Sequence, residues 1–221
     1  MACLSAPSCA QSPCAGLAPP PSRGCPPSHS TLLSSASQPF HPRRIFVRWQ
    51  RPGFGWFKLN FSGSVCNDGS SRASVGGAIR DCNGHILLAF AEPTEHSTFG
   101  IVEARALIRG LRLALSCFIR RLVVEGDDLV LVQLLRGEKT QTRIPRVMQE
   151  EILWLLGHFS AFQVQHIYRE GNQVAHVLCR EAYERPGVWK GGLMPLTVWE
   201  KAQDDVHGVP HERIWTKADM R

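Results

Sequence analysis

Residues Val123-Val124-Glu125-Gly126-Asp127-Asp128 form a short apolar, β-branched run that ends in an acidic pair. An amphipathic stretch, Leu129 to Leu135, follows directly. This order predicts a strand that delivers a carboxylate to the point where a helix begins. Such a carboxylate is typical of a metal or phosphate site, but aspartate is also a common helix N-cap. Asp127 therefore has two interpretations, a site residue and a cap, which can also hold together.

The segments on either side have the patterns of further strands and helices. Residues 56–64 alternate strictly, with Phe57, Leu59 and Phe61 on one face. Residues 76–89 form two predicted strands around an Asn-Gly turn, a strong hairpin signal. The other expected elements are strands at 121–127 and 162–168 and helices at 102–115, 145–159 and 173–183. The order predicts an α/β domain with a five-stranded mixed sheet, its first three strands antiparallel, and helices on both faces.

Five motifs in this order resemble the ribonuclease H type 1-like domains, most closely the plant branch found in retrotransposon-derived reading frames. The matching segments are Lys58-Leu59-Asn60-Phe61-Ser62-Gly63-Ser64, residues 77–84, Val102-Glu103-Ala104-Arg105-Ala106-Leu107, residues 124–128 and residues 166–176. The resemblance covers residues 56–183 and implies a ribonuclease H-like fold. It also implies a family activity, cleavage of the RNA strand of an RNA–DNA hybrid with two Mg²⁺ ions.

The resemblance implies four carboxylate positions, and this chain keeps two of them. The retained residues are Glu103, in the first helix, and Asp127, at the end of the fourth strand; these two are the expected metal ligands. The other positions hold Ser62 and His176. Serine is a neutral, weak ligand for Mg²⁺, and histidine prefers softer metals. We therefore expect a degenerate two-metal site in which Mg²⁺ binding is weakened.

Several residues near the site also have simpler interpretations. Asn172 is interpreted as the cap of the last helix rather than a substrate ligand. His176 alone is more typical of a helix surface than of a metal site. Arg105, Arg109 and Arg112 share one helical face, which is usually a solvated face and less often a phosphate contact.

The formal charge of +6 invites a nucleic-acid partner, but the charge is not in the predicted domain. Residues 52–184 contain 14 basic and 14 acidic side chains, whereas residues 1–51 contain five arginines and no acid. Non-specific attraction to nucleic acid would therefore come mainly from the N-terminal segment, and the domain would need a local basic patch.

Composition divides the chain into three parts. Residues 1–51 form a basic arm rich in Ser, Pro and Cys, expected to be disordered. Residues 52–184 form the ribonuclease H-like domain. Residues 185–221 form a tail with one short docking helix expected at Leu193–Lys201, the rest loose. The arm is interpreted as a disordered or spurious extension, with an organelle transit peptide as the alternative.

The remaining features bound the cellular setting. No run of about 18 apolar residues and no secretory core is present, so neither a membrane span nor a signal peptide is expected. The eight cysteines show no metal-ligand spacing and no disulfide framework. An intracellular monomer, nuclear or cytoplasmic, is expected, with RNA–DNA hybrid or RNA as its partner by resemblance and protein partners unknown.

Three functions stay open at this point. The first is a nucleic-acid-binding module with weakened or absent catalysis. The second is an active RNA–DNA hybrid endonuclease with a rearranged metal shell. The third is a structural or interaction remnant of a mobile element. Whether the chain is an enzyme is therefore undecided by its sequence.

Overall fold

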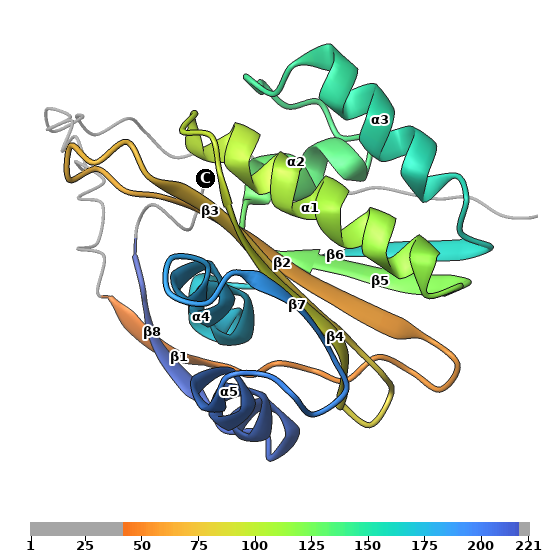
Figure 1. The fold of residues 1–221 in the computed structure, drawn as a ribbon, viewed down its shortest axis with the longest axis vertical. Coiled ribbons are helices and arrows are strands. Elements are labelled where there is room, and N and C mark those ends of the chain that lie inside the picture. Colours follow the sequence, from red (N-terminus) through yellow and green to blue (C-terminus); the bar gives the residue numbers. More distant parts are fainter. Residues whose placement is uncertain (1–41, 217–221) are drawn as a thin grey trace, which may run out of the picture. The chain divides into compact units, whose positions relative to one another are not determined.

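The computed structural model describes residues 42–216, and their main feature is a six-stranded mixed sheet of order β6-β5-β2-β3-β4-β7 (Figure 1). The strands are β2 (Phe57–Val65), β3 (Ala73–Arg80), β4 (Ile86–Thr94), β5 (Arg121–Gly126), β6 (Ala161–His166) and β7 (Gly187–Lys190). Strands β2, β3 and β4 pair antiparallel, as predicted, and β5 joins β2 in parallel. The predicted Asn-Gly turn joins β3 to β4, with Gly84 at φ +88°.

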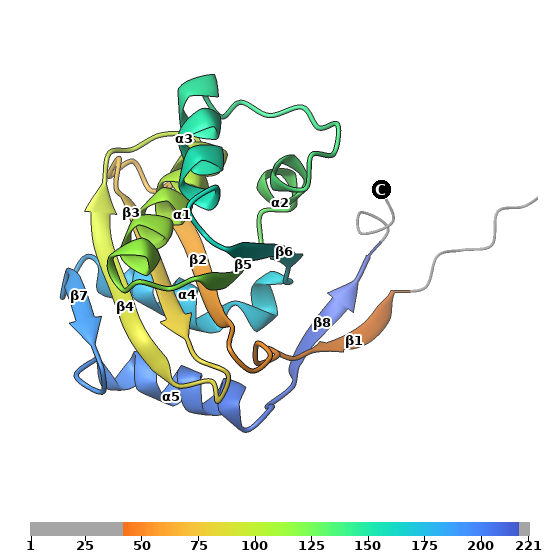
Figure 2. The ribbon, with the colours of Figure 1, turned by 90° about the vertical axis from the view of Figure 1, so that its right-hand side faces the viewer.

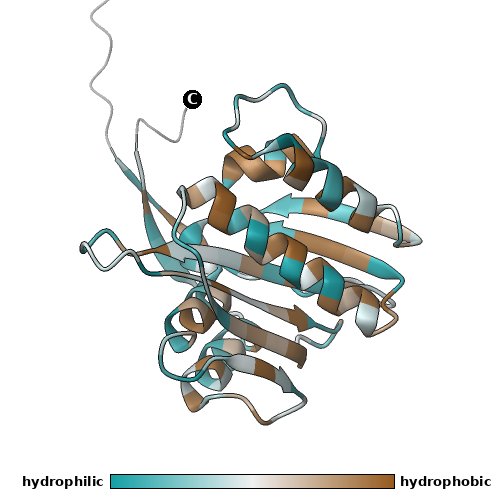
Figure 3. Cartoon of the chain, turned by 45° about the horizontal axis from the view of Figure 1, so that its top comes forward, coloured by the Kyte–Doolittle hydropathy of each residue, from teal (hydrophilic) through white to brown (hydrophobic). Residues whose placement is uncertain are grey.

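Helices cover both faces of this sheet (Figures 1 and 2). On one face lie α1 (Phe99–Ser116), α2 (Leu129–Leu135) and α3 (Arg146–Leu156), and on the other lie α4 (Gln173–Glu181) and α5 (Leu196–Val206). The larger apolar core packs α1 against β2 and α3 against α1, with Leu59, Phe61 and Leu107 fully buried. A smaller core packs α4 and α5 against β3 and β4. Figure 3 shows hydrophobic residues along the central strands and a mixture of hydrophobic and hydrophilic residues along α1.

The sequence predicted five strands, and the structure adds a sixth, β7, at the free edge of β4. This strand has only four residues between Pro186 and Gly191, too few to show an alternating pattern. The expected tail helix at Leu193–Lys201 is present but later, as α5 (Leu196–Val206). The expectation that the rest of the tail is loose is wrong, because β7 and β8 (His211–Trp215) both lie in it.

The predicted boundary between arm and domain at residue 51 lies too late in the chain. Strand β1 (Arg43–Val47) pairs antiparallel with β8 in a separate two-stranded sheet. Trp49 is only 3% exposed, and its Nε1 donates a hydrogen bond of 2.9 Å to Oδ1 of Asn60. The expected disorder of residues 1–41 lies outside the described residues.

Trp49 covers a layer of buried polar side chains on β2. The alternation in the sequence had shown only that two of them, Lys58 and Asn60, share a face of the strand. Lys58 Nζ pairs with Oε2 of Glu125 at 2.6 Å, and Nδ2 of Asn60 donates to Oε1 of the same carboxylate at 2.8 Å. The guanidinium of Arg80 lies 4.0 Å from the Trp49 ring centroid and pairs with Asp205 of α5 at 2.6 Å. Buried charges are tolerated when they are paired and hydrogen-bonded, so this layer joins both terminal extensions to the sheet.

Within residues 42–216, no helix is long and apolar enough to cross a lipid bilayer.

Trp49→Ala should lower the free energy of unfolding by about 3–5 kcal/mol, because it removes a buried ring and leaves the amide of Asn60 with one partner fewer. Urea denaturation measures the change. The control is Phe54→Ala, since Phe54 lies five positions away and is 94% exposed; it should change stability by less than about 0.5 kcal/mol. Equal effects of the two substitutions would show that Trp49 does not anchor the N-terminal segment.

Candidate functional site

The candidate site lies where β2 and β5 approach their carboxyl ends, beside α1 and α4. Ser62 is on β2, and Asp127 follows directly after β5. Because the two strands are parallel neighbours, their ends lie at the same edge of the sheet. Glu103 comes from the second turn of α1 and His176 from the start of α4. The structure thus brings together four residues separated by up to 114 positions in the chain.

Two glycines allow the helices to approach the sheet this closely. A Cβ at Gly63 would lie 2.6 Å from the backbone nitrogen of Glu103, and a Cβ at Gly76 would lie 2.6 Å from that of Cys179. Real side chains do not tolerate such distances, so only glycine lets α1 and α4 pack at these points. The same approach directs Glu103 and His176 towards Ser62 from opposite faces of the sheet.

The four side chains form one connected polar cluster. Oγ of Ser62 donates to Oε1 of Glu103 at 3.1 Å and lies 3.3 Å from Nδ1 of His176. Nε2 of His176 lies 3.2 Å from Oδ2 of Asp127, a close polar approach that is not a well-aligned hydrogen bond. Ser62 and Glu103 are fully buried, and the His176 side chain is 12% exposed. The imidazole therefore stands between the retained Asp127 and the serine.

Proton counting constrains the charge of this cluster. A serine hydroxyl has one proton, and the carbonyl of Gly63 is a third, longer partner at 3.4 Å. When Ser62 bridges Glu103 and His176, it donates to one of them and accepts from the other. Donation to Glu103 requires a hydrogen on Nδ1 of His176, and the approach to Asp127 requires one on Nε2, which makes an imidazolium. Donation to His176 instead requires a protonated Glu103. Both arrangements leave a net charge of −1 on Glu103, His176 and Asp127 together.

The pKa values of the two carboxyls move in opposite directions. Burial, followed by the charge of Asp127, raises the pKa of Glu103 well above 4.5, although the backbone N–H of Gly63 opposes the shift. Burial alone would also raise the pKa of Asp127, but the contact with His176 and the hydrogen bond from Asn172 outweigh it and lower that pKa. This pattern favours the arrangement with a neutral Glu103 and an ionised Asp127.

This donor set does not fit the two Mg²⁺ ions that the fold implies. Both oxygens of Asp127 already face nitrogen atoms, from Asn172 at 2.7 Å and from His176. Oε2 of Glu103 is buried with no hydrogen-bond partner among residues 42–216, but one oxygen of a carboxyl with a raised pKa is a poor ligand. No group of three His, Cys, Asp or Glu side chains in the described part of the chain could hold a metal ion. The role of Glu103 and Asp127 as metal ligands stays a prediction.

The two cap interpretations change in the structure. Asn172 occupies the N-cap position of α4, but its side chain makes no capping hydrogen bond. Its Nδ2 donates instead to Oδ1 of Asp127 and, at 2.9 Å, to the carbonyl of Phe61. Asp128, not Asp127, caps α2, accepting from the N–H groups of Val130 and Leu131. Asp127 is therefore free of a capping role, and Asn172 fixes its orientation.

The arginine face of α1 is engaged with acidic residues. Arg109 makes a two-pronged ion pair with Glu92, and Arg112 pairs with Glu151. Arg105 donates to the carbonyl of Glu95 and lies 3.6 Å from its carboxylate. These pairs compete with any phosphate for the guanidinium groups, so the solvated interpretation of this face is the better one.

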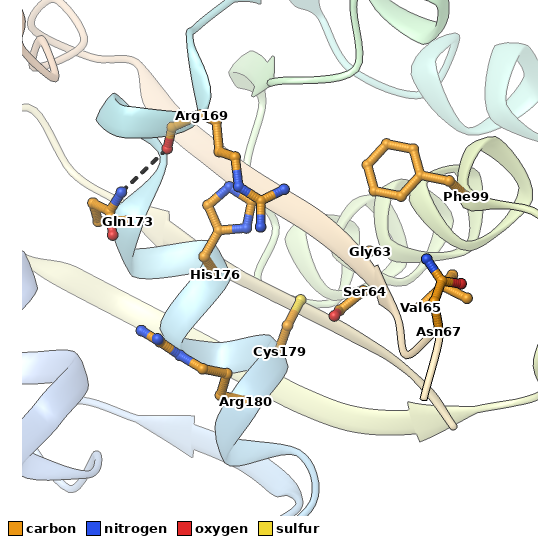
Figure 4. A pocket seen from close by; sticks show the side chains of 10 residues that line it. All are labelled: Gly63, Ser64, Val65, Asn67, Phe99, Arg169, Gln173, His176, Cys179 and Arg180. Atoms are coloured by element: carbon orange, nitrogen blue, oxygen red, sulfur yellow. Dashed lines mark hydrogen bonds between the residues drawn. The ribbon is translucent and has the colours of Figure 1, made fainter. Parts of the chain in front are cut away.

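A cavity of about 550 Å³ opens beside His176, and no sequence pattern predicted it (Figure 4). Its lining includes Arg169 from the short 3-10 helix η1 (Arg169–Gly171), Gln173 and Arg180 from α4, and Phe99 from the start of α1. The lining residues come from parts of the chain that are up to 117 positions apart, and none of them carries a local sequence pattern that marks a cavity. The cavity therefore becomes visible only in the folded chain.

The strand order, the helices on both faces and the convergence at the ends of β2 and β5 define a ribonuclease H-like fold. The model of the reverse transcriptase-like family matches residues 60–182, and the chain belongs to this family. A provisionally named ribonuclease H protein of Arabidopsis thaliana is 28% identical over 193 residues, which are 84% of this chain. The chain spans 30% of the length of that relative.

Solved ribonucleases H share the fold of this chain. Ribonuclease H1 of Halobacterium salinarum is 25% identical with a TM-score of 0.53, and the match covers 58% of this chain and 98% of that one. The ribonuclease H domain of Mycobacterium tuberculosis is 18% identical with a TM-score of 0.54, covering 58% and 94%. LC11 ribonuclease H1, solved in complex with an RNA/DNA hybrid, is 22% identical with a TM-score of 0.51, covering 58% and 97%.

Glu103→Gln should flatten the pH dependence of stability. The raised pKa means that the folded state holds a proton which the unfolded state releases above about pH 4.5. Wild-type stability should therefore fall as pH rises from 4.5 towards the folded pKa, by at most about 1.4 kcal/mol per pH unit from this group. The neutral glutamine cannot make this contribution. Urea denaturation from pH 5 to 8 measures both slopes, with the surface variant Glu138→Gln as control; equal slopes for Glu103→Gln and wild type would contradict a protonated Glu103.

Proposed function

We propose that this chain is a ribonuclease H-like nucleic-acid-binding module that does not cleave its ligand. The observation that carries the proposal is the side chain of His176, which stands 3.2 Å from Asp127 and 3.3 Å from Ser62. A cluster in which imidazole and serine groups occupy the positions beside the two retained carboxyls has little affinity for divalent cations.

Charge supports this proposal. Two-metal hydrolysis needs one ion to activate water and another to stabilise the leaving oxygen. The family site offers about four negative charges for this purpose. Proton counting in this chain leaves −1, because Glu103 and His176 share one added proton. The loss of negative charge at this site is therefore larger than the replacement of two carboxylates alone would give.

Fold likeness supports the nucleic-acid part of the proposal. LC11 ribonuclease H1, which has the same fold, was solved with an RNA/DNA hybrid. The proposed ligand of this chain is an RNA–DNA hybrid, held at the edge of the sheet where Ser62 and Asp127 meet.

The second candidate is an active hybrid endonuclease with a rearranged metal shell. The observation in its favour is Oε2 of Glu103, a buried acceptor without a partner within residues 42–216. An ion that displaced His176 would reach Glu103 and Asp127 together, and a softer metal such as Mn²⁺ would tolerate the imidazole as a ligand.

The cleavage assay separates the two candidates. The wild-type chain should bind a labelled RNA–DNA hybrid yet show no Mg²⁺-dependent cleavage above a protein-free control, because its site holds too little negative charge for two dications. Gel electrophoresis of the labelled RNA strand measures cleavage. Ser62→Asp combined with His176→Asp should raise Mg²⁺ affinity and restore some cleavage, and each single change should do less.

The contradicting outcome is cleavage by the unmodified protein. If that cleavage disappears in Glu103→Gln or Asp127→Asn, the site is active and its metal shell is rearranged. The matched control is Asp81→Asn, because Asp81 lies in the turn after β3 and its carboxylate contacts only that turn, through the N–H groups of Asn83 and His85 and the His85 ring.

A further inference from the structure

The cavity beside His176 has the charge of an anion site rather than of a cation site. None of its described lining residues is acidic, whereas Arg169 and Arg180 both line it. Both arginines are exposed, and neither guanidinium makes a hydrogen bond or ion pair with another residue of the described chain. The arginines of α1, in contrast, are paired with glutamates. Two unpaired guanidinium groups at one cavity predict an anionic ligand.

Arg180 also lines a neighbouring hollow that contains Glu181, Glu184 and Glu200. On the side of His176, the acidic side chain is that of Asp127. Its carboxylate is buried behind the His176 ring and held by Asn172, and it is not among the lining residues. Arg169 lies near enough for its charge to help lower the pKa of Asp127. The cavity therefore presents the imidazole of His176 and the amide of Gln173 together with two cationic side chains (Figure 4).

An aromatic side chain lies at the other side of the cavity. Phe99, which begins α1, is 44% exposed, and Figure 4 shows it across the cavity from Arg169 and His176. A second hollow of about 520 Å³, lined by residues 96–99, shares Val65, Asn67 and Phe99 with the first. The two hollows share three lining residues and so adjoin as one groove, in which Arg169 and Arg180 line the first hollow and the exposed ring of Phe99 lines both. A nucleotide has the matching groups, because its phosphate is an anion that binds guanidinium groups and its base is a flat ring that stacks on an aromatic side chain.

We propose that this groove binds one phosphodiester-linked nucleotide unit of a nucleic acid without metal, with Arg169 and Arg180 clamping the phosphate and Phe99 stacking on a base. The inference rests on the proposed nucleic-acid-binding function and names its contacts. Arginine binds phosphate through two parallel N–H donors, so the two side chains replace the neutralisation that metal ions would otherwise supply. Binding through this groove is therefore insensitive to chelators.

The test is fluorescence anisotropy with a labelled RNA–DNA hybrid and the full chain in EDTA. Arg169→Gln and Arg180→Gln should each weaken binding by about tenfold and reduce the salt slope by about one. Arg180→Lys should lie between wild type and Arg180→Gln, because lysine keeps the charge but not the two-pronged geometry. Phe99→Ala should weaken binding by about tenfold through loss of stacking.

Matched controls make the outcome specific. Arg121→Gln removes the same charge from an exposed arginine at the start of β5, the end opposite Asp127, and should change affinity by less than about twofold. Phe54→Ala removes an exposed ring outside the groove and should also leave affinity unchanged. The melting temperature of each variant shows that it is folded.

The outcomes separate this inference from the function on which it rests. Hybrid binding by the wild type that Arg169→Gln and Arg180→Gln do not weaken more than Arg121→Gln would overturn the groove but keep the nucleic-acid function. Binding that needs Mg²⁺ would overturn the metal-free clamp. No binding by the wild type at low salt would overturn the proposed function, and the groove with it.

Discussion

The buried chain of contacts from Glu103 through Ser62 and His176 to Asp127 is the interaction on which the rest of this site depends. It connects α1, β2, α4 and the end of β5 through direct side-chain contacts. Its geometry requires Gly63 and Gly76, because any side chain there would separate the helices from the sheet. In this arrangement the imidazole of His176 lies between Ser62 and the retained Asp127, 3.2 Å from the carboxylate.

The segments outside the family match are part of the folded unit. The match ends at residue 182, but Asp205 of α5 forms a buried ion pair with Arg80, and Trp49 covers Asn60 and Arg80. Polar residues on the covered face of β2 would be costly without these partners. The β1–β8 ribbon also holds the two ends of the described chain together. The site at one end of the sheet and this polar layer on its face are therefore supported by different parts of the chain.

The sequence predicted those strands and helices correctly whose local pattern agrees with their contacts in the folded chain. The alternation of β2 and the Asn-Gly hairpin predicted the antiparallel arrangement of the first three strands. The resemblance to ribonuclease H-like domains grouped Ser62 with Asp127. The sequence did not predict β7 and β8, because strands of four and five residues carry too little pattern. The role predicted for Asn172 is wrong, because a helix-start position does not show where an amide side chain points. The cavity and the two arginines that line it could not be predicted for the same reason, because these residues come together only when the chain is folded.

The most direct test of this account is the response of the folded protein to Mg²⁺ followed by calorimetry. A ligand that binds only the folded state stabilises it by mass action. If His176 and Asp127 satisfy one another, the wild-type melting temperature should be unchanged between EDTA and millimolar Mg²⁺, whereas His176→Asp should melt at a higher temperature in Mg²⁺ than in EDTA. A saturable increase for the wild type that disappears in Asp127→Asn would contradict the account, because it would show a working metal site.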